Sequence, residues 1–219
     1  TKTIPIVFYS GSDPVASGLV DSLARPGENI TGFTTMTAVL AGKRLELLKE
    51  TVPKLTRVAA LWNPQDTSSR QTWNESQLAA RELGLQIHSM EVSRSNQFEN
   101  AFKEAIKAGS GALALMNGPF LYSNQKQIVA LAAKHRLPSI YSNKEFVVSG
   151  GLMAYGADET EPYRRLASIS DKIIKGRKPA DLPVEQPTKF EFIVNLKAAK
   201  EIGLTIPPDV LARATKVIK

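Results

Sequence analysis

Cysteine is absent from this chain of 219 residues, and histidine occurs only twice. The first absence excludes disulfides, thiolate nucleophiles and cysteine metal sites. Neither His88 nor His135 falls in a loop where chemistry is expected, and no His-x-x-x-His pair is present. Also missing are a Gly-x-Ser-x-Gly elbow, a Walker A loop and the Gly-x-Gly-x-x-Gly pattern of dinucleotide sites. These absences predict a protein that is not an enzyme and that holds no cofactor and no metal.

Long apolar runs and one-signed charge clusters are lacking as well. No apolar run is long enough to span a bilayer. The formal net charge is +7, but lysines and arginines are scattered among acids, which favours an ordinary basic surface and no nucleic-acid partner. Lys43, Arg44, Glu46, Lys49 and Glu50 are mixed in sign, as on a solvated helix face.

Short apolar runs alternate with segments of helical period along the chain. Strands are predicted at 4–9, 29–32, 57–62, 86–92, 112–116, 138–141, 150–155 and 190–194. Helices are predicted at 13–24, 41–51, 68–83, 96–107, 123–135, 161–175 and 196–202, with a peripheral segment from Leu204 to the end. Strand–helix alternation at this spacing predicts an α/β fold with parallel sheets covered on both faces.

Residues 4–32 are expected to supply only two strands and one helix. A two-stranded parallel fragment cannot bury both of its faces. The chain also opens directly before a buried-type strand. We therefore expect either that residues upstream complete this half or that it packs on another copy as a homodimer.

Ligands of open α/β sheets bind beyond the carboxyl ends of the strands, which selects the loops to examine. Ser10, Gly11, Ser12 and Asp13 join the first strand to a predicted helix, whose N-terminus would attract a carboxylate. The alternative is that Ser12 or Asp13 only caps that helix.

Amides and aromatics follow three later strands, a combination that suits a pocket for a small organic molecule. The candidates are Asn63, Asn117, Phe120 and Tyr141. Turn chemistry is the alternative for each asparagine, and core packing is the alternative for the two aromatics.

Motifs along the whole chain resemble the ABC transporter substrate-binding family that includes tryptophan-importer binding proteins. The matching runs are 4–8, 13–15, 18–20, 23–27, 29–32, 42–50, 58–64, 151–156, 178–190 and 195–197. The resemblance implies a type I periplasmic-binding fold with two Rossmann-like lobes and a ligand held in the cleft. Lobe one would comprise 1–36 plus 156–183, lacking its N-terminal part, and lobe two 37–155 plus 184–219.

With that fold, the chain would cross between lobes near 34–40, 155–158 and 183–187. The resemblance implies a small-molecule ligand, an aromatic or branched amino acid, delivered to an ABC permease by a periplasmic or membrane-anchored extracellular protein. Ser10, Gly11 and Ser12 would meet the ligand carboxylate. The full set of expected ligand-binding residues is Ser10, Gly11, Ser12, Asp13, Thr34, Thr35, Asn63, Asn117, Phe120, Tyr141 and Tyr155.

Two other functions are compatible with the same architecture. An enzyme would need a base near Ser10–Asp13, for which Asp13, Glu145 and Asp158 are the candidates. A ligand-sensing domain of a regulator would be fused to a DNA-binding or signalling domain.

Overall fold

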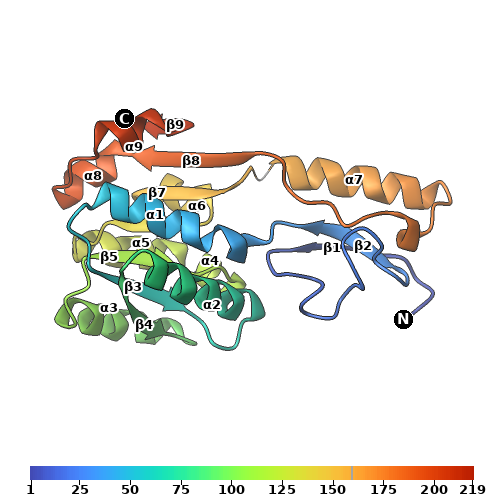
Figure 1. The fold of residues 1–219 in the computed structure, drawn as a ribbon, viewed down its shortest axis with the longest axis horizontal. Coiled ribbons are helices and arrows are strands. Elements are labelled where there is room, and N and C mark those ends of the chain that lie inside the picture. Colours follow the sequence, from blue (N-terminus) through green and yellow to red (C-terminus); the bar gives the residue numbers. More distant parts are fainter. Residues whose placement is uncertain (159) are drawn as a thin grey trace. The chain divides into compact units, whose positions relative to one another are not determined.

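The computed structural model describes residues 1–158 and 160–219, which form two compact units (Figure 1). Unit 1 comprises Thr1–Met36 and Ala157–Phe190, and unit 2 comprises Thr37–Gly156 and Glu191–Lys219. The predicted boundary after residue 183, and the crossing at 183–187, differ from the observed boundary after Phe190. The reason is backbone pairing: Glu185 N–H donates to Gly32 O (2.9 Å), and Thr34 N–H donates to Glu185 O (3.0 Å).

Unit 1 is built on two parallel strands, β1 (Ile6–Ser10) and β2 (Ile30–Thr34), paired from Ile6↔Ile30 to Ser10↔Thr34. Helix α7 (Thr160–Ile174) contacts both strands, and the short helix η3 (Pro179–Asp181) contacts β2. Gly32 allows the strands to approach closely, because a Cβ there would lie 2.1 Å from Phe8 O.

The helix predicted at 13–24 does not form. Residues 14–18 make a single turn, in which Ser17 N–H donates to Asp13 O (3.1 Å). Gly18 then adopts φ +69°, the left-handed conformation that ends helices. Val15 and Leu19 remain exposed, so no packing of an apolar face sustains a longer helix.

Unit 2 contains a seven-stranded sheet in the order β4-β3-β5-β6-β7-β8-β9. The strands are β3 (Arg57–Trp62), β4 (Gln86–Glu91), β5 (Ala112–Leu115), β6 (Ser139–Tyr141), β7 (Met153–Ala157), β8 (Phe190–Asn195) and β9 (Lys216–Ile218). The helices are η1 (Thr37–Leu40), α1 (Ala41–Thr51), α2 (Thr67–Glu82), η2 (Ser95–Gln97), α3 (Phe98–Lys107), α4 (Pro119–Ser123), α5 (Gln125–Lys134), α6 (Lys144–Val148), α8 (Leu196–Ile202) and α9 (Pro208–Ala212).

Helices cover both faces of this sheet, as parallel strands require. Leu45 and Leu48 of α1 join Ala80 of α2 and Ala198 of α8 in the core on one face. Phe102 of α3, Ile128 of α5 and Phe146 of α6 belong to the core on the other face. The strand–helix alternation predicted for 57–141 is therefore present.

The segment after Leu204, predicted to be peripheral, is instead part of unit 2. Ile206 and Val210 are buried in the same core as α1. Strand β9 extends the sheet by pairing in parallel with β8, from Ile193↔Lys216 to Asn195↔Ile218. Removing this segment would expose apolar side chains and one edge of the sheet.

Two glycine substitutions test the packing inside each unit, one in unit 1 and one in unit 2. Gly32→Ala forces a Cβ against the backbone of β1, so we expect the free energy of unfolding to fall by about 2 kcal/mol. Gly42→Ala in α1 meets only Ala79 Cβ at 3.4 Å, so we expect a gain of about 0.5 kcal/mol. Urea denaturation measures both. A Gly32→Ala protein as stable as the parent would contradict the close approach of β1 and β2.

Candidate functional site

The carboxyl ends of β3, β5 and β6 meet at one edge of the sheet of unit 2. Strands β3 and β5 pair in parallel up to Leu61↔Leu115, and β5 pairs with β6 at Ala114↔Ile140. Asn63 and Asn117 each follow the last paired residue of β3 and β5 by two positions. The two loops approach each other closely, because a Cβ on Gly118 would lie 2.7 Å from Asp66 Oδ2.

Asn63 is held in a turn by its own side chain. Its Oδ1 accepts from Gln65 N–H (2.9 Å), and its backbone N–H donates to Ser69 Oγ (3.0 Å). The side chain is only 7% exposed. Asn63 therefore forms the turn that was its predicted alternative role. This turn uses only the oxygen of the side-chain amide.

Asn117 is linked to Tyr122, which is not among the predicted site residues. The hydroxyl of Tyr122, in α4, donates to Asn117 Oδ1 and lies 3.1 Å from Ser142 Oγ. Asn117 is 5% exposed, and Ser142 follows β6. Tyr122 thus joins the ends of β5 and β6, which no spacing in the sequence indicates.

Arg44 of α1 is buried, contrary to the prediction of a solvated helix face. It is 3% exposed and donates from Nη2 to Thr37 O (2.7 Å) and from Nη1 to Tyr155 O (3.4 Å). No carboxylate within the described residues lies within 4.0 Å of it. Burial lowers the pKa of Arg44 to about 10, and the nearby Tyr122 and Tyr155 oppose this shift. The interior of unit 2 therefore contains a cation without an acidic partner.

The two aromatic candidates at the strand ends differ in burial. Tyr141 is fully buried and stacks on Phe146 with ring centroids 4.7 Å apart, and its burial raises the pKa of its hydroxyl. The prediction that the Tyr141 ring faces a ligand is corrected, because core packing buries it. Phe120 stacks on Phe98 at 5.6 Å but is half-buried, so its contact with a ligand stays a prediction. Tyr155 is half-buried in β7.

Ser10, Gly11, Ser12, Thr34 and Thr35 come together in unit 1, but their polar groups bond mostly to one another. Ser10 Oγ and Ser12 Oγ are 2.8 Å apart, and Thr35 N–H donates to Ser10 O (2.9 Å). Thr34 is fully buried and its hydroxyl donates to Ser12 O (2.8 Å). Thr34 therefore holds the loop rather than presenting its hydroxyl, which corrects its predicted role.

Asp13, Asp158 and Glu145 do not form a catalytic group. Asp13 Oδ1 accepts from Val15 N–H (2.8 Å), so it caps its own turn. Asp158 Oδ1 accepts from Thr160 N–H (2.8 Å), and Glu145 is exposed on α6. Within residues 1–158 and 160–219, no group of three or more histidine or acidic side chains could hold a metal ion.

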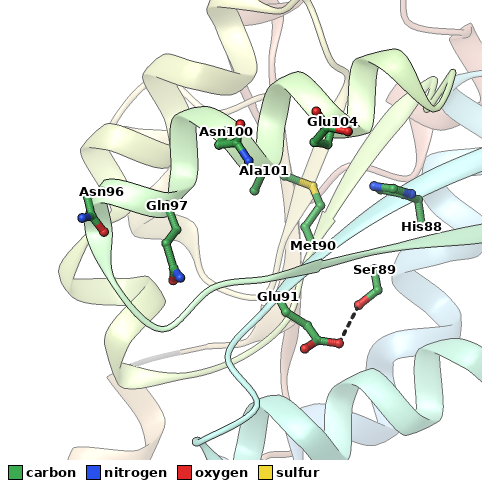
Figure 2. A pocket seen from close by; sticks show the side chains of 9 residues that line it. All are labelled: His88, Ser89, Met90, Glu91, Asn96, Gln97, Asn100, Ala101 and Glu104. Atoms are coloured by element: carbon green, nitrogen blue, oxygen red, sulfur yellow. Dashed lines mark hydrogen bonds between the residues drawn. The ribbon is translucent and has the colours of Figure 1, made fainter.

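A groove of about 370 Å³ follows the open edge of β4 beside α3, remote in sequence from these loops. Figure 2 shows that Ser89 and Glu91 extend to one side of β4, joined by a hydrogen bond, whereas His88 and Met90 extend to the other. The polar side chains that line this groove do not converge on one point, and none of the predicted site residues lines the groove.

None of the helices in the described part of the chain has the length and apolar character that membrane crossing requires.

Comparisons with known proteins agree over nearly the whole chain. The family model described as "ABC transporter substrate binding protein" matches residues 1–218. A protein named "Tyrosine-binding protein", from Clostridioides difficile (strain R20291), is 25% identical over 207 residues, which cover 93% of this chain and 58% of that protein. The chain thus spans less than two thirds of that curated relative.

Solved structures show the same fold. A conserved domain protein from Vibrio cholerae O1 superposes with a TM-score of 0.92 at 27% identity, covering 99% of this chain and 72% of that one. The ABC domain in complex with L-Trp from Streptococcus pneumoniae gives 0.88 at 26% identity, covering 100% and 75%. A LacI-family regulator from Bifidobacterium animalis, at 14% identity and a TM-score of 0.63, shares the fold alone. The predicted α/β fold with parallel sheets is confirmed.

Arg44 allows a test of the buried cation. Arg44→Lys keeps the buried charge, but an ammonium cannot reach both carbonyls, so we expect the free energy of unfolding to fall by about 2 kcal/mol. Arg44→Met also loses the two hydrogen bonds but removes the cost of burying a charge, so it should be less destabilising than the lysine variant.

Urea denaturation ranks the two proteins, and Arg81→Met on the exposed face of α2 serves as the control, with an expected change within about 0.5 kcal/mol. A lysine variant more stable than the methionine variant would show that the charge at this position is solvated.

Proposed function

Since the chain belongs to the ABC transporter substrate-binding protein family, we propose that it captures an amino acid with an aromatic or branched side chain for an ABC importer. The family consists of extracytoplasmic solute-binding proteins with the type I periplasmic-binding fold. The observation that carries the proposal is the likeness, over the full chain, to a domain whose structure contains L-Trp. The name of the tyrosine-binding relative supports the same ligand class.

The proposed ligand contacts come from the strand ends of each unit. Ser12 and Thr35 offer polar groups on unit 1, and Asn63, Asn117 and Tyr155 offer them on unit 2. Tyr155 is half-buried, so part of its ring is available to pack on a flat or apolar side chain. Ligand binding would stabilise one conformation of the protein, which the importer then recognises.

Delivery to a permease and a periplasmic or membrane-anchored location are part of the same proposal. A solute-binding protein needs no catalytic group, and Asp13, Asp158 and Glu145 are engaged in caps or exposed. The likeness to LacI-type regulators extends only to the fold, so transport is favoured over regulation.

Isothermal titration calorimetry with L-tryptophan, L-tyrosine, L-phenylalanine, L-leucine, L-isoleucine and L-valine tests the ligand class. We expect at least one of them to bind with a Kd of about 1 µM or tighter, about −8 kcal/mol. Glycine and the D-enantiomer of the best ligand are the controls. If none of the six gives saturable heat, the proposed ligand class is wrong.

Unit 1 has the features of a self-association surface. Ile4 is 64% exposed, and Ile6 and Tyr9 of β1 are exposed as well. An exposed strand with apolar side chains favours pairing with a second chain. We expect multi-angle light scattering to show a concentration-dependent dimer that Ile4→Lys weakens at least threefold, whereas Leu78→Lys on α2 leaves it unchanged. A monomer at every concentration would refute this expectation.

A further inference from the structure

The amide nitrogens of Asn63 and Asn117 are donors without an acceptor. In each residue Oδ1 is already engaged, by Gln65 N–H or by the Tyr122 hydroxyl. Neither Nδ2 donates a hydrogen bond to any part of the chain that the structure describes, although both side chains are more than nine-tenths buried. The fully buried polar side-chain atoms that lack a partner there belong to Ser110, His135 and Tyr141. Both amide nitrogens therefore remain accessible to a ligand.

The paired ends of β3 and β5 bring the two loops together. Asn63 and Asn117 each follow the last paired residues, Leu61 and Leu115, by two positions, and the loops meet where a Cβ on Gly118 would lie 2.7 Å from Asp66 Oδ2. Paired strands lie about 4.8 Å apart, and alternate residues point to the same face. A carboxylate offers two acceptor oxygens, so one carboxylate can receive a hydrogen bond from each amide.

Asp66 supplies the opposite charge beside them. Its Oδ1 caps α2, accepting from Ser68 N–H (2.9 Å) and Ser68 Oγ (2.6 Å). Its Oδ2 accepts no hydrogen bond from the described residues, and it lies against the turn after Asn117, because a Cβ on Gly118 would be 2.7 Å away. One carboxylate oxygen thus remains available next to the two amide donors.

Tyr122 orients the amide of Asn117. The Tyr122 hydroxyl donates to Asn117 Oδ1, which turns the NH₂ group away from the tyrosine. Arg44 is buried in the same unit, where its guanidinium donates to Thr37 O and Tyr155 O.

In unit 1, the hydroxyls of Ser10 and Ser12 lie 2.8 Å from each other, and no helix begins after Asp13. The positive helix N-terminus that the sequence had predicted therefore does not add to a carboxylate site at Ser10–Ser12.

We propose that the loops after β3 and β5 bind the zwitterionic backbone of the amino-acid ligand. The amide nitrogens of Asn63 and Asn117 donate to its α-carboxylate, and Asp66 Oδ2 accepts from its α-ammonium. Tyr122 is a positioning residue that acts through Asn117. This inference rests on the proposed function and assigns the ligand's two charged groups to named atoms of unit 2.

Isosteric substitutions separate these roles. Asn63→Asp and Asn117→Asp keep the Oδ1 acceptor but replace the NH₂ group with a carboxylate oxygen, which repels the ligand's carboxylate. We expect each to weaken the best amino acid of the calorimetric panel at least about 30-fold. Binding of the corresponding decarboxylated amine, tryptamine for L-tryptophan or tyramine for L-tyrosine, should change less than threefold or become tighter.

Asp66→Asn keeps the cap on α2 and removes the charge. We expect about a tenfold loss for the amino acid and less than a threefold change for the deaminated acid, indole-3-propionate or 3-(4-hydroxyphenyl)propionate. Asn74→Asp, exposed on α2, makes the same charge change as the asparagine variants away from these loops and should bind like the parent. Thermal unfolding checks that every variant is folded.

The outcomes separate this inference from the proposed function. If the parent binds an amino acid and the Asn63 and Asn117 variants bind it within threefold of the parent, the subsite is wrong and the function stands. Equal losses for the amino acid and its amine would also overturn the carboxylate assignment. If the parent binds none of the six amino acids, both proposals fall.

Discussion

The parallel pairing of β3 with β5 is the constraint on which the candidate site depends. Val58 to Leu61 and Ala112 to Leu115 are buried, and helices cover both faces of the sheet. A slip of one residue would turn every side chain of one strand to the opposite face, so burial on both faces fixes the register. The same register brings the ends of β3 and β5, and the loops that carry Asn63 and Asn117, to one edge of the sheet. The apolar core therefore determines where the polar groups of the edge lie.

Those parts of the fold whose signals are local could be predicted from the sequence. The bounds predicted for 57–62, 41–51 and 196–202 match β3, α1 and α8, because apolar period and helix ends are visible in a single segment. Asn63 and Asn117 were predicted as ligand contacts from their positions after buried strands, and this role stays a proposal. Asp66 was not predicted as a site residue, although an aspartate directly before the first residue of a helix is a recognisable cap signal.

The remaining features depend on contacts between distant segments. Arg44 sits in a run of mixed charge that has the composition of a solvated face, and only the packing of α1 against η1 and β7 buries it. The segment 13–24 has a good cap, but Val15 and Leu19 stay exposed, so its local preference does not produce a helix. Tyr122 gains its role from Ser142, twenty residues away.

The two tryptophans of the chain, Trp62 and Trp73, both belong to unit 2 and stack with ring centroids 5.1 Å apart and planes 7° from parallel. Trp62 directly precedes Asn63, and its indole N–H donates to Ser89 Oγ (2.8 Å). Stacked indoles couple electronically, so their fluorescence and near-ultraviolet circular dichroism report on a single location. The protein consequently carries an intrinsic optical probe next to the strand end where Asn63 lies, while unit 1 is silent at tryptophan wavelengths.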